Sequence, residues 1–215
     1  TLGSGALAAT DNNAIVDWVF VELRSSIDNT AVLDSRSALV QRDGDIVDLD
    51  GTSMITFNSA TTGNYYVVVK HRNHLGVMTK DAIGLSTAAT VEDFRKASTP
   101  TYTISNAIIN QAQVVVTQGT AMWAGNTLYD RKVIFQGSAN DVNPIYQQII
   151  NAASNVFVTP YFILKGYKNT DVNLDGKTIL QGTNNDVEFI FNNVQKNHPG
   201  NVFKANFFII NEQLP

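Results

Sequence analysis

Oxygen-bearing side chains occupy alternate positions in one short stretch of this chain. Asp171, Asn173 and Asp175 stand at positions 1, 3 and 5 of a loop, and Gly176 follows at position 6. Calcium takes about six to eight oxygen ligands, a glycine at position 6 permits the sharp turn, and the next carbonyl, here that of Lys177, is the usual fourth ligand. The spacing predicts a calcium-binding loop. A metal-free turn is the alternative, because Asx-Gly clusters also form ordinary turns.

The second half of this loop lacks the acidic residue that an EF-hand carries at position 12, which here is Gly182. Asp186, four residues further on, is the candidate for the missing ligand if the loop is longer than the standard one. Its alternative role is to cap the amino terminus of the following helix, as Asp commonly does.

The element occurs twice, because residues 130–142 align with residues 175–187 at a constant offset of 45. The match extends to the pairs Ile145 with Ile190, Tyr146 with Phe191 and Phe162 with Phe207. A duplication of this length predicts two similar units that pack on each other. In the first copy Leu128 offers no ligand and Arg131 brings a positive charge to the turn, so we expect that copy to lack metal.

These features resemble the dockerin-like carboxy-terminal modules of large secreted and surface proteins of Bacteroidetes-type bacteria. In the second half of the chain the resemblance rests on Met122-Trp123-Ala124-Gly125, the two Lys-x-x-x-Gln-Gly-x-x-Asn-Asp runs from Lys132 and Lys177, the Asp171 loop and residues 208–215. In the first half, residues 16–24, 41–45 and 71–78 resemble the β-rich domain that often precedes such a module. The resemblance implies an extracellular, non-enzymatic part that calcium stabilises.

The hydrophobic pattern divides the chain into three parts. Residues 1–12 are small and have no helical or strand period, which predicts a flexible segment. Residues 13–98 contain short β-branched and aromatic runs between turn signals, which predicts a β-sandwich. Residues 99–215 would form the duplicated calcium-loop and helix module, with repeats at about 126–166 and 171–211 and helices at about 143–153 and 186–197. The expected fold class is mainly β with some α.

Two other groups of polar side chains have simpler interpretations than a metal site. Acidic residues alternate closely at Asp43, Asp45, Asp48 and Asp50. The Asp-Gly pairs among them are typical of hairpin turns on either side of a short strand. His71 and His74 are three residues apart, so on a regular strand their side chains point to opposite faces and do not chelate one ion.

Composition restricts the function further. The 215 residues are 44% hydrophobic and 16% charged, which is enough apolar material for a packed core, and the net charge of −4 gives no electrostatic basis for binding nucleic acid. There is no cysteine, and no apolar run reaches the roughly 20 residues that a membrane span needs. Because extracellular calcium sites work at dissociation constants of about 10⁻⁴–10⁻³ M, the calcium loop predicts a location outside the cell or at its surface.

No catalytic motif accompanies these features: there is no Gly-rich phosphate loop, no Gly-x-Ser-x-Gly and no His-Glu-x-x-His, so we do not expect an enzyme. We expect a structural subunit that self-associates into a surface layer, sheath or filament, or that joins another surface protein. The alternative is an adhesin or a module that binds carbohydrate or protein through exposed aromatic side chains. Trp18 lies in an apolar run and is expected in the core, and the candidate aromatic platforms are Trp123, Tyr129, Tyr161 and Tyr167.

Overall fold

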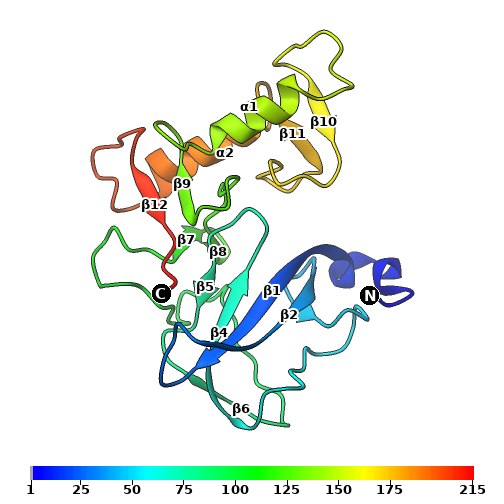
Figure 1. Cartoon of the computed structure of the whole chain (residues 1–215), viewed down its shortest axis with the longest axis vertical. Coiled ribbons are helices and arrows are strands. Elements are labelled where there is room, and N and C mark those ends of the chain that lie inside the picture. The colour runs from blue at the N-terminus through cyan, green and yellow to red at the C-terminus, as the bar shows by residue number, and fades with distance from the viewer. Residues whose placement is uncertain (1) are drawn as a thin grey trace.

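A computed structural model describes residues 2–215 of the chain, which form a mainly β protein with two short helical segments (Figure 1). The amino-terminal half is one antiparallel sheet in the order β3-β2-β1-β4-β5, with β6 paired to the first residues of β4. Its strands are β1 Ile15–Ser25, β2 Val32–Gln41, β3 Ile46–Val47, β4 Gly63–Lys70, β5 Val77–Met78 and β6 Ile83–Leu85. A sandwich needs two packed sheets, so the predicted β-sandwich is replaced by a single sheet here.

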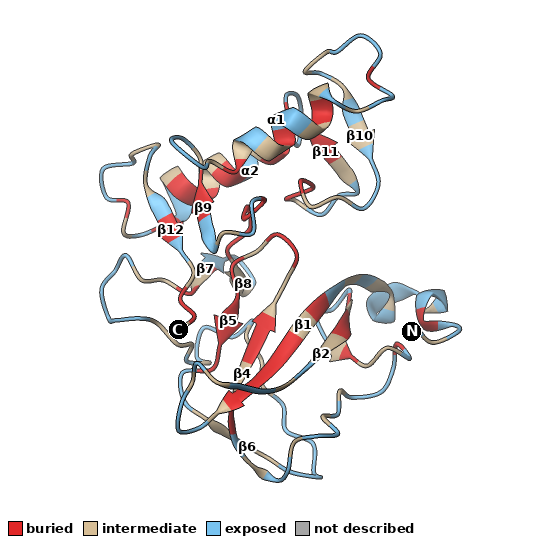
Figure 2. Cartoon of the chain, in the orientation of Figure 1, coloured by how far each residue is buried: buried red, intermediate tan, exposed pale blue. Residues whose placement is uncertain are grey.

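The two faces of this sheet are covered by different parts of the chain. On one face Val19, Val21 and Val69 form a core, and Phe57 and Phe94, which lie in loops, pack against it. On the other face, Val68 and Met78 pack under Leu214 and Tyr102, which come from the second half of the chain. Figure 2 shows buried residues along β1 and β4, between these two covers. The first half therefore depends on the second for part of its core.

The amino-terminal segment packs on the edge of the sheet. Residues 1–12 were predicted to be flexible; Thr1 lies outside the described residues, and the segment from Leu2 onward contains two short turns of 3₁₀-helix, at Ala6–Ala8 and Asp11–Asn13. Ala6 is buried against Leu39 and Val47, and the amide of Gly3 donates to the carbonyl of Leu49. The predicted hairpin turns at Asp43-Gly44 and Asp50-Gly51 are confirmed, since each lies between paired residues on either side of β3.

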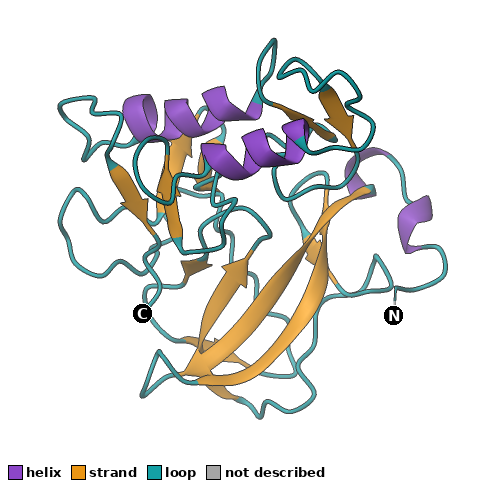
Figure 3. Cartoon of the chain, turned by 45° about the horizontal axis from the view of Figure 1, so that its top comes forward, coloured by secondary structure: helices purple, strands orange, loops and turns teal. Residues whose placement is uncertain are grey.

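The second half begins with a two-stranded ribbon, β7 Gln113–Val116 and β8 Gly119–Met122. Two similar units follow. The first contains β9 Lys132–Ile134, α1 Val142–Ile150 and β10 Ile163–Lys165, and the second contains β11 Lys177–Ile179, α2 Asp186–Phe191 with a π-helical extension Asn192–Asn197, and β12 Ile209–Asn211. The helices agree with the predicted ranges, except that α1 begins one residue earlier than predicted, and they lie side by side in Figure 3.

Each unit completes the other by exchanging a strand. The last strand of the first unit, β10, pairs with β11, and the last strand of the second, β12, pairs with β9 in the equivalent register. Between them, the helices bury Ile145 and Ile149 against their counterparts Ile190 and Val194, and all four are completely buried. The units are thus related by an approximate two-fold axis, and because they share one core we expect neither to be stable alone.

The extra residue of the second unit lies in its π-helical turn. The offset between equivalent residues is 45 before the helices, but it becomes 46 after them, as in the pairing of Ile163 with Ile179 and of Ile209 with Ile134. A π-helical turn is the usual way for a helix to absorb one inserted residue. The counterpart of Phe162 is therefore Phe208, not the predicted Phe207: Phe162 and Phe208 both pack on the core, whereas Phe207 is exposed.

Candidate functional site

The predicted ligands Asp171, Asn173, Asp175 and Lys177 lie on one tight loop between β10 and β11. Both oxygens of the Asp171 carboxylate accept backbone amides from within this loop, Oδ1 from Asp175 at 3.1 Å and Oδ2 from Gly176 at 3.0 Å. The side chain of Asn173 accepts from the amide of Asp175, and that of Asp175 accepts from the amide of Lys177. Gly176 has a φ of +80°, as the sharp turn requires. The loop thus directs its side-chain oxygens inward.

Asp186 has a different position from that of a loop ligand. Its carboxylate is completely buried and accepts three backbone amides, those of Val172 and Asn173 on Oδ1 and that of Ile179 on Oδ2. Burial raises the pKa of Asp186 to about 6, against the opposite effect of these hydrogen bonds. The helix cap is not Asp186 but its neighbour Asn185, whose side chain accepts from the amide of Glu188. Asp186 therefore ties the two ends of the loop together.

The electrostatics of the loop suit only a weak cation site. The guanidinium of Arg72 lies 3.7 Å from Asp171, and the ammonium of Lys177 lies 3.5 Å from Asp175. Both cations offset the two loop carboxylates. Within residues 2–215 no three His, Cys, Asp or Glu side chains gather closely enough to hold a metal ion. Asp171, Asn173 and Asp175 still offer side-chain oxygens within one loop, so calcium stays a prediction, with the affinity typical of extracellular modules.

The first unit keeps the same scaffold without the same oxygens. Asp141 is completely buried and accepts the amides of Thr127, Leu128 and Ile134, as Asp186 does at the equivalent positions. Asn126 stands in place of Asp171 and accepts the amide of Asp130. The two loops share one conformation, since the positive φ angles of Tyr129 and Arg131 match those of Leu174 and Gly176. The hydrogen-bonded conformation of the loop therefore does not require the side chains that are predicted to bind calcium.

The segment 71–74 joins the amino-terminal sheet to the Asp171 loop. Asn73 is completely buried, and its side-chain amide donates to the carbonyls of Asn169 at 2.9 Å and Asp171 at 2.7 Å. Arg72 donates to the carbonyl of Lys168 and lies over the ring of Tyr167, 4.3 Å from its centroid. The hydroxyl of Tyr167 in turn donates to Asp17 on β1. The predicted calcium loop is thus a part of the joint between the two halves.

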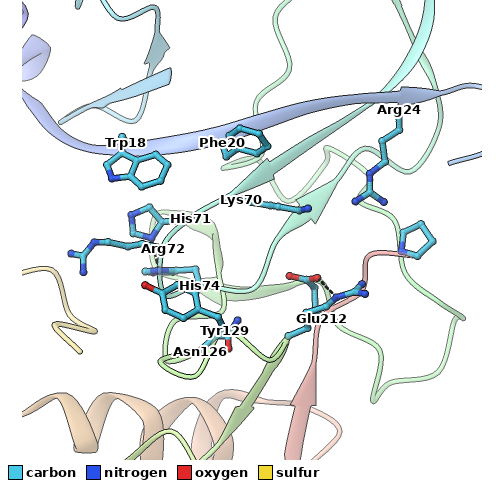
Figure 4. A pocket seen from close by; sticks show the side chains of 12 residues that line it. Trp18, Phe20, Arg24, Lys70, His71, Arg72, His74, Asn126, Tyr129 and Glu212 are labelled. Atoms are coloured by element: carbon cyan, nitrogen blue, oxygen red, sulfur yellow. Dashed lines mark hydrogen bonds and ion pairs between the residues drawn. The ribbon is translucent and has the colours of Figure 1, made fainter. Parts of the chain in front are cut away.

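A cleft of about 360 Å³ lies beside this joint, between β1 and the loop of the first unit. Figure 4 shows Trp18 and Phe20 on its upper wall and Asn126 and Tyr129 on its lower wall, with Lys70 between them. Trp18 was predicted to lie in the core, but 42% of it is exposed. Trp18 shares its side of β1 with Glu22 and Arg24, and polar residues at alternate positions are the signal from which a face outside the apolar core could have been inferred, although Glu22 and Arg24 are themselves buried.

The histidines that were expected to point apart meet at the floor of the cleft. β4 ends at Lys70, so residues 71–74 no longer follow the alternation of a strand. Nδ1 of His71 and Nδ1 of His74 are 2.8 Å apart, and Nε2 of His71 is 3.0 Å from the Asp17 carboxylate. Burial raises the pKa of Asp17, but hydrogen bonds from His71 and Tyr167 outweigh it and hold that pKa well below its ordinary value. Asp17 is therefore a carboxylate and accepts from Nε2 of His71.

The tautomer of His74 follows from the groups around it. Asn73 uses its amide nitrogen on two carbonyls, so its Oδ1 faces Nδ1 of His74, at 2.8 Å, as an acceptor. Nδ1 of His74 must then carry a proton, and its N–H points at Asn73 and at the unprotonated Nδ1 of His71. Burial is the main cause that lowers the pKa of His74 to about 3. Its Nε2 is consequently a hydrogen-bond acceptor at neutral pH.

The predicted aromatic platforms separate into two groups. Trp123 is buried, stacks on His198 and donates from Nε1 to the carbonyl of Gln111, so it belongs to the core. Tyr129, Tyr161 and Tyr167 are exposed, although Tyr167 is held by Asp17. Only Tyr129 of these three lines the cleft.

No protein-family model, curated protein or solved structure matches this chain. The resemblance to dockerin-like modules therefore stays a prediction from the sequence. In residues 2–215, none of the helices has the length and apolar character needed to cross a membrane.

Proposed function

We propose that this protein is an extracellular structural subunit, stabilised by calcium, that self-associates into a filament, sheath or surface layer. One observation carries the proposal: the two units of the second half present equivalent, exposed apolar loops. In the first unit Phe157 is 88% exposed, and in the second its counterpart Phe203 is 94% exposed. The neighbouring valines and the paired aromatics Tyr161 and Phe207 are exposed as well.

These loops are braced, although their apolar side chains face water. The side-chain amide of Asn155 donates to the carbonyls of Ile149 and Thr159, and its oxygen accepts the amide of Thr159. Asn201 makes the equivalent three hydrogen bonds in the second unit. A braced loop loses little conformational entropy on docking, and exposed apolar patches of this kind commonly mark protein interaction sites. These hydrogen bonds therefore favour the interpretation that the exposed apolar side chains of the two loops dock on another molecule.

The arrangement of the loops favours a linear assembly. They lie at opposite ends of the helix pair in both views (Figures 1 and 3). A contact between the first loop of one copy and the second loop of the next leaves one loop free on each copy. Such a head-to-tail contact extends into a filament unless its rotation closes a ring.

Calcium would act at the joint between the two halves. An ion held by Asp171, Asn173, Asp175 and the carbonyl of Lys177 would make this loop more rigid. Arg72 and Asn73, which follow β4 of the sheet, contact the same loop at Asp171. Calcium at millimolar concentration outside the cell suits the weak site described above. Chelation should therefore loosen both the module and any assembly built from it.

The experiment is a complementation test with two single variants, Phe157→Ser and Phe203→Ser. We expect the parent protein in 5 mM calcium to form polymers at about 100 μM, as measured by sedimentation velocity and electron microscopy. Each variant alone should stay monomeric, because each has lost one side of the only contact. An equimolar mixture should form one-to-one dimers and nothing longer, because one intact loop of each kind is present.

The matched control is Ile27→Ser, which removes a side chain that is 97% exposed on the β1–β2 turn, and it should polymerise like the parent. A parent protein that is monomeric under these conditions would contradict the assembly. Single variants that still dimerise by themselves would contradict the head-to-tail contact.

A binding module for carbohydrate is the second candidate function. It is favoured by the open aromatic cleft, which lies away from the two apolar loops and involves none of their residues. The two functions are compatible, because they would use different surfaces of one molecule.

A further inference from the structure

We propose that the cleft between β1 and the Tyr129 loop binds an acidic glycan, through a sugar that carries a carboxylate. The inference rests on the second candidate function and not on self-association. The volume of the cleft, about 360 Å³, is within the range of small-molecule sites and is enough for one or two sugar rings.

The aromatic side chains of the cleft suit the apolar face of a sugar. Trp18 is 42% exposed and Tyr129 is 63% exposed, and they come from opposite walls (Figure 4). An aromatic ring with water on one face contributes apolar contact at a low cost in conformational entropy. Two such walls define a slot for a flat ligand.

The charge that faces solvent in the cleft is positive, although the charged side chains are paired. The side chain of Lys70 is 38% exposed while that of its partner Glu22 is 7% exposed, and Arg131 is 54% exposed over Glu212 at 8%. The cations thus cover their carboxylates. A ligand that enters meets ammonium and guanidinium groups first, and these attract an anion even though the whole chain carries −4.

Both cations keep free donors for a ligand carboxylate. An ammonium has three N–H groups, and Glu22 accepts from Lys70. Arg131 uses Nε on Glu212 and Nη2 on the carbonyl of Leu214, which leaves Nη1. Charge-assisted hydrogen bonds of this kind are about twice as strong as neutral ones.

The histidine array supplies the complementary polar group. His74 lines the cleft, and its assigned tautomer leaves Nε2 as an acceptor for a ligand hydroxyl. Asp17 and Asn73 fix the two rings, so this acceptor is oriented before the ligand arrives. A carboxylate, a hydroxyl and an apolar ring face are together the chemistry of a uronic acid.

The test is isothermal titration of the full chain with the trisaccharide of galacturonic acid and with its neutral galactose counterpart. We expect the acidic trisaccharide to bind at least tenfold more tightly than the neutral one, and this advantage should shrink with added salt. Trp18 is the exposed one of the two tryptophans, so its fluorescence should change on binding and report the site.

Two variants and one control locate the binding. Tyr129→Ala and Lys70→Met should each weaken binding of the acidic trisaccharide at least tenfold. Tyr161→Ala removes a tyrosine of similar exposure, 69%, from an assembly loop and should leave glycan affinity unchanged. Circular dichroism should show that all three are folded.

Several results would overturn the inference. They are the absence of binding at 10 mM ligand, equal affinity for the neutral trisaccharide, or binding that Tyr129→Ala and Lys70→Met leave intact. Equal binding of a hexa-aspartate peptide at the same residues would show that the ligand is an acidic protein segment and not a glycan. None of these results bears on the sedimentation experiment, so a failure here is separate from a failure of the assembly.

Discussion

The two units of the second half have one scaffold and different loop chemistry. In both, a buried aspartate receives three backbone amides, and the loops share their left-handed residues and their exchanged strands. Only the second unit carries the full set of predicted calcium ligands, since in the first Asn126 and Leu128 replace Asp171 and Asn173, and Arg131 replaces the turn residue Gly176. The loop conformation is therefore maintained by side-chain acceptors for backbone amides, and it does not depend on a complete ligand set.

The first loop has acquired other contacts where the ligands are missing. Arg131 binds Glu212 and the carbonyl of Leu214, which packs on the sheet of the first half. Tyr129 lines the cleft. Both copies of the loop thus contribute to the joint; the second carries the predicted ion ligands, and the first lines the candidate ligand site.

The largest expected effect tests whether the scaffold is equivalent in the two units. Asp141→Ala and Asp186→Ala should each lower the free energy of unfolding by at least about 3 kcal/mol, because three buried amides lose their acceptor. The losses should be similar when measured by urea denaturation without calcium. Asp130→Ala, which removes one exposed acceptor, is the control and should cost far less. A small loss of unfolding free energy in either variant would show that the two buried aspartates do not stabilise their units equally.

A second effect should be confined to the second unit. His198 is completely buried between Trp123 and Phe208, and its counterpart in the first unit is Ala152. Burial lowers the pKa of His198 to about 4. Because the unfolded chain binds a proton near pH 6.5 and the folded chain does not, this residue should cost roughly 3 kcal/mol of stability as the pH falls from 6.5 to 4.

The comparison of His198→Phe with the parent isolates this contribution. His74 has a lowered pKa of the same sign, and burial raises the pKa of Asp141 and Asp186, so the parent curve is a sum of opposing effects. The difference in unfolding free energy between parent and variant should change by roughly 3 kcal/mol between pH 7 and pH 4. A difference that is independent of pH would show that the pKa of His198 is the same in the folded and the unfolded chain.

The smallest effect tests the difference in loop chemistry. At 10 mM, calcium with a dissociation constant of about 10⁻⁴–10⁻³ M should stabilise the parent by about 1.4–2.7 kcal/mol. Asp175→Ala should abolish this gain, and Asp130→Ala, the same change in the first loop, should preserve it. Calorimetric melting with calcium and with chelator measures both. A gain that survives Asp175→Ala would place the ion elsewhere.

Local patterns in the sequence predicted the elements that depend on near neighbours. The duplication, the loop turn at Gly176, the hairpin turns around β3 and the two helical ranges follow from the spacing of glycines, Asx residues and apolar side chains. The buried faces of the helices followed too, since Ile145, Ile149, Ile190 and Val194 recur at helical spacing.

The tertiary structure decided what depends on pairing between distant residues. The spacing of strands in a sequence does not reveal whether they form one sheet or two. The predicted sandwich was therefore wrong, and the structure has a single sheet in this half. The end of β4 at Lys70 brought His71 and His74 together, and the open side of β1 exposed Trp18. Residues 71–74 are held by contacts across the joint, where long-range packing overrides the local period of the chain.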